Sequence, residues 1–104
     1  MPPFELSAQA VIDLETIADF IASDSPAAAR EVVAAIRESC RLASQFPEMG
    51  FRRPRLTSKP VRFHVVPQFP NYLIAYLPDS KPLQVVRVLR AFQSTRRLVV
   101  DSAE

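Results

Sequence analysis

Residues 72–90 read YLIAYLPDSKPLQVVRVLR, two runs of β-branched and aromatic residues separated by a short polar segment. Runs of this composition, bounded by proline and turn residues, predict β-strands over Tyr72–Leu77 and Leu83–Arg90. The connection at 79–82, Asp-Ser-Lys-Pro, is short enough to join two antiparallel strands. We therefore expect these residues to form the centre of a sheet.

Two more strands are predicted upstream. Residues 61–66 alternate in character: Val61, Phe63 and Val65 would face the helices, and Arg62, His64 and Val66 would face the other way. The segment at 3–6, Pro-Phe-Glu-Leu, suits a short edge strand. The prolines at 67–71 discourage further pairing at the sheet edge.

Between these strands lie two amphipathic helices, predicted at 8–23 and 26–44 from apolar residues at three- and four-residue spacing. Ser7 and Ser25 suit the N-cap positions, and Pro26 suits the first helical position because it has no N–H to leave unpaired. The link between them is short, which forces an antiparallel hairpin. The buried stripes would be Val11, Leu14, Ile17, Ala18 and Ile21 in the first helix, and Ala29, Val32, Val33, Ile36, Cys40 and Ala43 in the second, with Asp13, Glu15 and Asp19 in water.

The element order is βααβββ, which predicts an α+β fold with an antiparallel helical hairpin packed on one face of a mostly antiparallel sheet. At 104 residues the chain forms one domain, with its core at about 4–98 and a polar tail at 99–104. Gly50, the single glycine, is expected in a left-handed backbone conformation after the second helix.

Charge is divided unevenly along the chain. The first fifty residues carry three arginines against eight acids, a net charge of −5, whereas residues 51–104 carry ten Lys or Arg against three acids, a net charge of +7. This asymmetry indicates an acidic or polyanionic partner for the second half, although the two halves neutralising each other would explain it equally well. Cys40 stands alone, and no leader or membrane-length apolar run is visible, so we expect a cytoplasmic protein without membrane contact.

Four segments together resemble the ParE toxins of the ParE/RelE superfamily, which includes plasmid stabilisation proteins. They are ASQFPEMG at 43–50, Val-Arg at 61–62, YLIAY at 72–76 and VRVLR at 86–90. The resemblance extends over about 4–98. It implies the toxin half of a type II toxin–antitoxin pair, bound as a hetero-oligomer by a cognate antitoxin that combines a ribbon–helix–helix part with an acidic amphipathic tail. For ParE members it implies inhibition of DNA gyrase, and for RelE members ribosome-dependent mRNA cleavage.

The residues favour gyrase inhibition over catalysis. Cleavage of RNA without a metal needs a proton acceptor, a proton donor and cations for the phosphate. Cations are plentiful, including a basic patch of Arg52, Arg53, Arg55, Lys59 and Arg62. Proton-transfer groups are scarce, because His64 is the single histidine and 92–104 contains no Tyr or His. If the chain were a RelE-like nuclease, its catalytic residues would be Arg62, His64 and Arg87. A third hypothesis is a non-toxic relative that still binds an antitoxin.

Arg87 is a candidate for partner contact, because a charge within an apolar strand is costly unless it reaches water or a partner. On the same face as Arg62, it would extend a basic strip across the sheet. The alternative is a structural salt bridge to a helix carboxylate. His64 is by the same pattern a polar surface residue, and Cys40 a small core residue.

The segment 90–98, RAFQSTRRL, combines three arginines with two large apolar residues, the composition of interface anchors. We expect it to bind the target. The target-binding residues are then Arg87, Arg90, Phe92, Arg96 and Arg97. Packing of the apolar residues along the sheet edge, with the arginines in water, is the alternative.

The sequence lacks the residues that other classes of functional site require. One His and one Cys cannot supply a metal site, and a chain with one glycine has no phosphate-binding loop, so neither metal nor cofactor is expected. No helix combines basic and aromatic residues for reading DNA, so the toxin alone should not bind DNA specifically.

Overall fold

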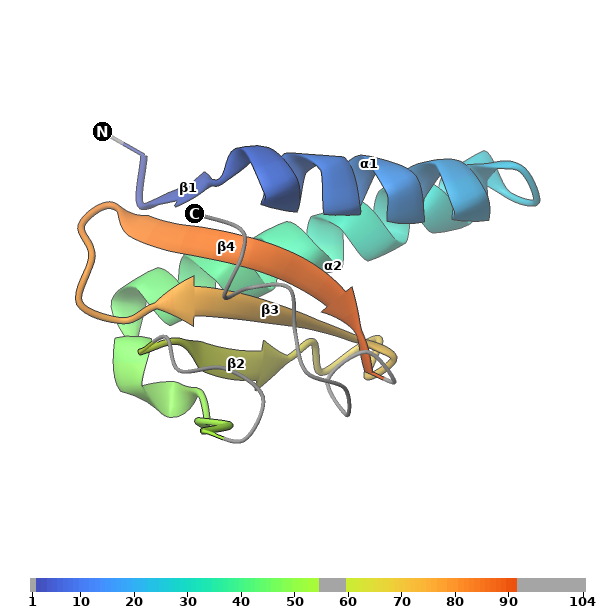
Figure 1. Ribbon diagram of the computed structural model, residues 1–104. Coiled ribbons are helices and arrows are strands. Elements are labelled where there is room, and N and C mark those ends of the chain that lie inside the picture. Colours follow the sequence, from blue (N-terminus) through green and yellow to red (C-terminus); the bar gives the residue numbers. More distant parts are fainter. Residues whose placement is uncertain (1, 55–59, 92–104) are drawn as a thin grey trace.

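The computed structural model describes residues 2–54 and 60–91, which form two helices on a four-stranded sheet (Figure 1). The elements follow in the predicted order: β1 (Phe4–Leu6), α1 (Ala8–Ala22), α2 (Pro26–Gln45), the short 3-10 helix η1 (Pro47–Met49), β2 (Arg62–Val65), β3 (Tyr72–Leu77) and β4 (Leu83–Arg90). The α+β architecture and the helical hairpin are confirmed.

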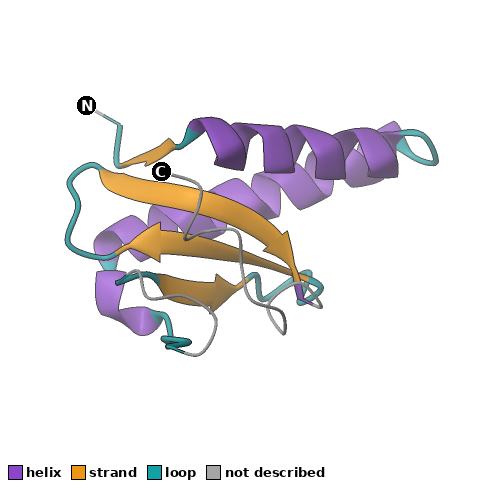
Figure 2. Ribbon diagram, in the orientation of Figure 1, coloured by secondary structure: helices purple, strands orange, loops and turns teal. Residues whose placement is uncertain are grey.

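The strands lie in the order β1-β4-β3-β2, with β1 parallel to β4 and the other pairs antiparallel. Helix α2 crosses behind the sheet, whereas α1 runs beside the outer edge of β4 (Figure 2). Within the described residues, β1 pairs with Leu83–Val85 alone, so the rest of that edge of β4 faces α1 instead of a strand.

Both helices begin where serine caps were predicted. The Ser7 Oγ accepts a hydrogen bond from Ala10 N at 3.0 Å, and the Ser25 Oγ accepts one from Ala28 N at 3.1 Å. Each bond satisfies a backbone N–H that has no partner within its own helix. Pro26 stands at the start of α2, as expected. Among the described residues, neither helix is long and apolar enough to cross a membrane.

The main core fills the space between the helices and one sheet face. Most of the predicted stripes are there, including Leu14, Ile36 and Cys40, and Ala10 joins them. Burial raises the pKa of the Cys40 thiol to about 12, so it behaves as a small core residue, as expected. The prediction that Val11 is buried was wrong, because 38% of the surface of this residue is exposed.

A second cluster lies on the sheet face away from the helices and contains Val61, Phe63, Leu73, Ala75 and Leu89. The predicted orientation of β2 was therefore inverted. His64 pairs with Ile74, whose side chain packs under the helices, so Arg62 and His64 are on the helix side and Phe63 is on the other. Alternation separates two sets of side chains but cannot assign a face when both faces carry apolar residues.

Candidate functional site

Asp13 of α1 and Arg87 of β4 form an ion pair that is almost fully buried. The Arg87 Nε lies 2.7 Å from Asp13 Oδ2 and its Nη2 lies 3.0 Å from Oδ1, the two-pronged geometry that guanidinium and carboxylate groups favour. Side-chain exposure is 7% for Arg87 and 10% for Asp13. The prediction that Asp13 faces water was wrong, since the helix turns this carboxylate towards the strand.

The same carboxylate also satisfies the backbone of β4, because Asp13 Oδ2 accepts a hydrogen bond from Val88 N at 3.0 Å. Ser7 binds the backbone of β4 just before Val88: its N donates to Val85 O at 2.9 Å, and its Oγ donates to Val86 O at 2.8 Å. Side chains of the α1 turn and helix thus replace the strand that β1 is too short to supply.

Arg87 therefore forms a structural salt bridge with a helix carboxylate, which was the predicted alternative to contact with a partner. The expected basic strip does not form. Arg87 pairs in register with Ala75 on the face away from the helices, whereas Arg62 and His64 are on the helix face. The three residues of the nuclease alternative are not brought together.

His64 is half-buried on the helix face, where desolvation lowers its pKa below the usual value. It is therefore neutral at pH 7. Its Nε2 is buried without a hydrogen-bond partner among the described residues. The expectation of a polar surface residue is only half met, and the residue paired with His64 across the sheet, Ile74, carries neither an acid nor a base.

Gly50 is at the centre of a polar cluster where the end of α2 meets the sheet. The buried Tyr76 hydroxyl donates to Pro47 O at 2.7 Å and accepts from Gly50 N at 3.0 Å. Arg62 Nη1 donates to Gly50 O at 2.7 Å. The left-handed conformation expected for Gly50 was wrong, since its φ is −76°. Close approach is the reason for glycine here: a Cβ would lie 2.6 Å from the Tyr76 hydroxyl and 2.8 Å from Phe63 O.

Gly50→Ala is expected to destabilise the protein by about 1–3 kcal/mol, the usual cost of overpacking a filled site. Urea unfolding followed by circular dichroism would measure it. Tyr76→Phe in the same background removes the nearest clashing atom, so it should cost less there than in the wild type. Equal costs in both backgrounds would contradict this account of the clash.

The basic patch is only partly described. Arg52 and Arg53 are exposed, and the Arg53 guanidinium lies 4.7 Å from the centre of the Phe51 ring. Arg52 and Arg62 line a small cavity of about 210 Å³ together with Glu48 and Asp79, so acids offset the cations there. Arg55 and Lys59 lie outside the described residues.

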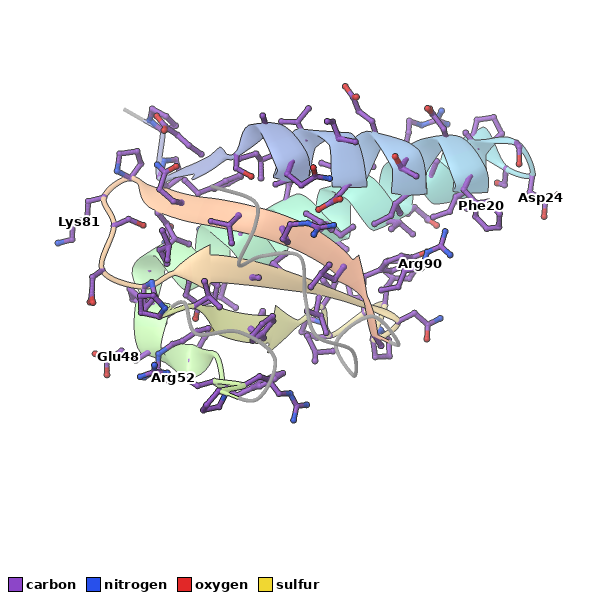
Figure 3. The ribbon with its side chains drawn as sticks, in the orientation of Figure 1. Phe20, Asp24, Glu48, Arg52, Lys81 and Arg90 are labelled. Atoms are coloured by element: carbon purple, nitrogen blue, oxygen red, sulfur yellow. The ribbon has the colours of Figure 1, made fainter. Side chains whose placement is uncertain are left out.

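Of the predicted target-binding residues, Arg90 is half-buried and lies beside an aromatic ring that was not among the predicted residues. Its guanidinium lies 5.2 Å from the centre of the Phe20 ring, and Phe20 is 67% exposed (Figure 3). The available signal was that Phe20 falls outside the α1 stripe that contains Leu14 and Ile17. Phe92, Arg96 and Arg97 lie outside the described residues.

The arrangement is suited to binding. Within 2–54 and 60–91, no group of three or more His, Cys, Asp or Glu side chains gathers as a metal site would require. The features that remain are exposed arginines, exposed aromatic and aliphatic side chains, and the buried ion pair that fixes α1 on β4.

The chain is similar to known proteins in both sequence and fold. Residues 4–94 match the model of the family described as "ParE toxin of type II toxin-antitoxin system, parDE". A solved structure described as the chromosomal ParDE toxin–antitoxin system from P. aeruginosa is similar, with a TM-score of 0.68 and 23% identity, over 84% of this chain and 92% of that chain. No curated protein matches the chain significantly.

Proposed function

The chain belongs to the ParE toxin family of type II toxin–antitoxin systems, and from this premise we propose that it inhibits DNA gyrase by protein–protein binding. In this proposal a cognate antitoxin holds it inactive. Family membership over residues 4–94 is the observation that carries the proposal. The toxin and its target would meet in the cytoplasm.

The positions of the polar groups support inhibition by binding over RNA cleavage. A nuclease needs its acid, its base and its phosphate-binding cations around one reacting phosphate. Here His64 and Arg62 are on one sheet face, and Arg87 is committed to Asp13 from the other. Neutral His64 could accept a proton, but Ile74 opposite it carries no proton-transfer group. The hydroxyl of Tyr76, opposite Arg62, is already bonded to Pro47 O and Gly50 N.

The proposed target-binding surface is Arg90 with Phe92, Arg96 and Arg97. Arg87 contributes to it as a positioning residue, since its ion pair fixes α1 and Phe20 relative to the end of β4 where Arg90 lies. Arginines and aromatic rings in one place are typical of the few residues that dominate an interface.

The proposed antitoxin joins a ribbon–helix–helix part to an acidic amphipathic tail and forms a hetero-oligomer with the toxin. The net charge of +7 over residues 51–104 would attract that tail. Specific DNA binding by the complex would come from the antitoxin, because neither helix of the toxin has the basic and aromatic residues that read a groove.

The proposal is tested by adding the purified chain to a gyrase supercoiling assay and, separately, to mRNA on translating ribosomes. We expect loss of supercoiling with intact mRNA. The triple variant Arg90→Ala, Arg96→Ala, Arg97→Ala should lose both gyrase inhibition and growth arrest. As a matched control, Arg30→Ala, Arg37→Ala, Arg41→Ala removes three exposed arginines from α2 and should keep both activities.

A triple variant that folds normally and still inhibits gyrase would show that the arginines after β4 do not bind the target. If mRNA is cut and Arg62→Ala or His64→Ala stops the cutting together with the growth arrest, the RelE-like nuclease is the correct function. An inactive wild type that binds the antitoxin would identify the chain as the non-toxic relative.

A further inference from the structure

The second apolar cluster lies on the sheet face away from the helices, which we call the outer face. Figure 1 looks onto this face, with α2 behind the sheet. Five of its side chains are at most 2% exposed: Val61, Phe63, Leu73, Ala75 and Leu89. The cluster contains no residue of α1 or α2, because both helices pack against the opposite face. Within 2–54 and 60–91, no helix therefore covers the outer face.

A single layer of strands does not bury its own side chains so completely. The apolar side chains on one face of a sheet stand roughly perpendicular to it and stay exposed until a second layer packs on them. Phe51 supplies part of that layer, since its ring stacks on the Phe63 ring with 5.9 Å between the ring centres. The described residues supply no more of this layer, because the other members of the cluster belong to the sheet itself or adjoin it.

Arg87 gives a second, polar indication of a missing layer. It lies on the outer face in register with Ala75, and its side chain is 7% exposed. Asp13 binds its Nε and Nη2, whereas its Nη1 is buried without a hydrogen-bond partner among the described residues. A buried N–H group is destabilising until an acceptor reaches it. The outer face therefore requires a layer that is mainly apolar and places one oxygen beside Arg87.

Two segments outside the described residues are available for this layer. Residues 55–59, Arg-Leu-Thr-Ser-Lys, contain a single apolar side chain, Leu56. Residues 92–104 continue from the end of β4 and contain Phe92 and the apolar run Leu-Val-Val at 98–100. An extended segment of that length spans about 40 Å, whereas the axes of β4 and β2, two strands apart, are separated by about 10 Å. The C-terminal segment has both the reach and the apolar side chains.

We propose that residues 92–104 fold back across the outer face and pack the apolar run at 98–100 on its cluster. An oxygen atom of the same segment accepts the hydrogen bond from Arg87 Nη1. The sheet is then enclosed between the helices on one side and the chain's own C-terminal segment on the other. Burial of the apolar run against Phe63 and Leu89 stabilises this arrangement.

This packing has a consequence for two of the proposed target-binding residues. Arg96 and Arg97 directly precede the apolar run, so a run that is fixed on the sheet holds both arginines close to it. Side chains that are held in place before binding lose less conformational freedom in the complex. This consequence rests on the proposed function, whereas the packing of the segment does not depend on it.

The first test is an NMR measurement on the full wild-type chain with labelled methyl groups. Nuclear Overhauser effects are expected between the methyl protons of Leu98 or Val100 and the ring protons of Phe63, because such effects arise only between protons in close contact. Methyl groups at 98–100 that show no contact with the sheet would overturn the proposal. Contacts from Leu56 in their place, or from a second copy in a dimer, would assign the cover elsewhere and overturn it as well.

The second test is Leu98→Asp, which places a charge in the covering layer. The melting temperature should fall by roughly 5–10 °C, and binding of the dye ANS should rise several-fold as the outer face becomes exposed. The matched control is Ser102→Asp, which adds the same charge at a polar position of the same segment and should shift the melting temperature by less than about 2 °C. Equal effects of the two variants on melting and on dye binding would overturn the proposal.

A gyrase assay separates this inference from the proposed function. Leu98→Asp, assayed below its melting temperature, should inhibit gyrase several-fold less than the wild type, because Arg96 and Arg97 are no longer held. Full inhibition by this variant, despite the expected fall in melting temperature, would overturn the positioning of the arginines. A wild-type chain that shows the NMR contacts but does not inhibit gyrase would overturn the proposed function and support the packing of the segment.

Discussion

Asp13→Ala is expected to lower the free energy of unfolding by about 3–5 kcal/mol, the cost of leaving one partner of a buried ion pair uncompensated. The substitution leaves the buried Arg87 guanidinium without its anionic partner. One of its nitrogens, Nη1, is already buried without a hydrogen-bond partner among the described residues. It also leaves Val88 N without its acceptor. Urea unfolding at pH 7, monitored by circular dichroism, measures the loss.

Two companion variants show whether loss of the ion pair causes the fall in the free energy of unfolding. Asp19→Ala removes an exposed acid from the same helix and should change the free energy by no more than about 0.5 kcal/mol. Asp13→Leu combined with Arg87→Met replaces both charges by apolar groups and should recover part of the loss, because no charge is left buried alone. A cost for Asp13→Ala no larger than that of Asp19→Ala would contradict the buried pair.

Ile36→Ala is expected to cost about 2–5 kcal/mol, since it removes buried methyl groups and leaves a cavity. Ile36 is 0% exposed in the core between α2 and the sheet. In a domain of this size the melting temperature should fall by roughly 10 °C or more, which differential scanning calorimetry measures directly.

The control is Ile12→Ala, the same change of side chain at a position that is 54% exposed. It should leave the melting temperature within a few degrees of the wild type, because little apolar surface is lost from the core. Similar losses at both positions would mean that Ile36 is not the core residue that the structure indicates.

Local chemistry made the secondary structure predictable. Serine caps at Ser7 and Ser25, helical spacing of the apolar residues and β-branched runs each act within a few residues of the chain, so their outcome does not depend on distant contacts. The order of elements then restricted the topology to a helical hairpin on a sheet. The four segments at 43–50, 61–62, 72–76 and 86–90 together carried the family resemblance.

The candidate site depended on contacts that sequence spacing does not contain. Asp13 and Arg87 are 74 residues apart, and only the docking of α1 along the edge of β4 brings them within 2.7 Å. The face of Arg62 and His64 was decided by register against Ile74 and Tyr76, because alternation gives two sets of side chains without saying which set meets the helices.

The sequence by itself thus determined the order of the helices and strands and placed their ends to within one residue, since caps, periodicity and turn residues are local. Tertiary structure alone decided that Gly50 is needed for close packing against Tyr76, that Arg87 is held by Asp13, and that Phe20 lies beside Arg90. The physical reason is that burial and charge pairing depend on which distant surfaces meet. That is settled by the packing of whole elements.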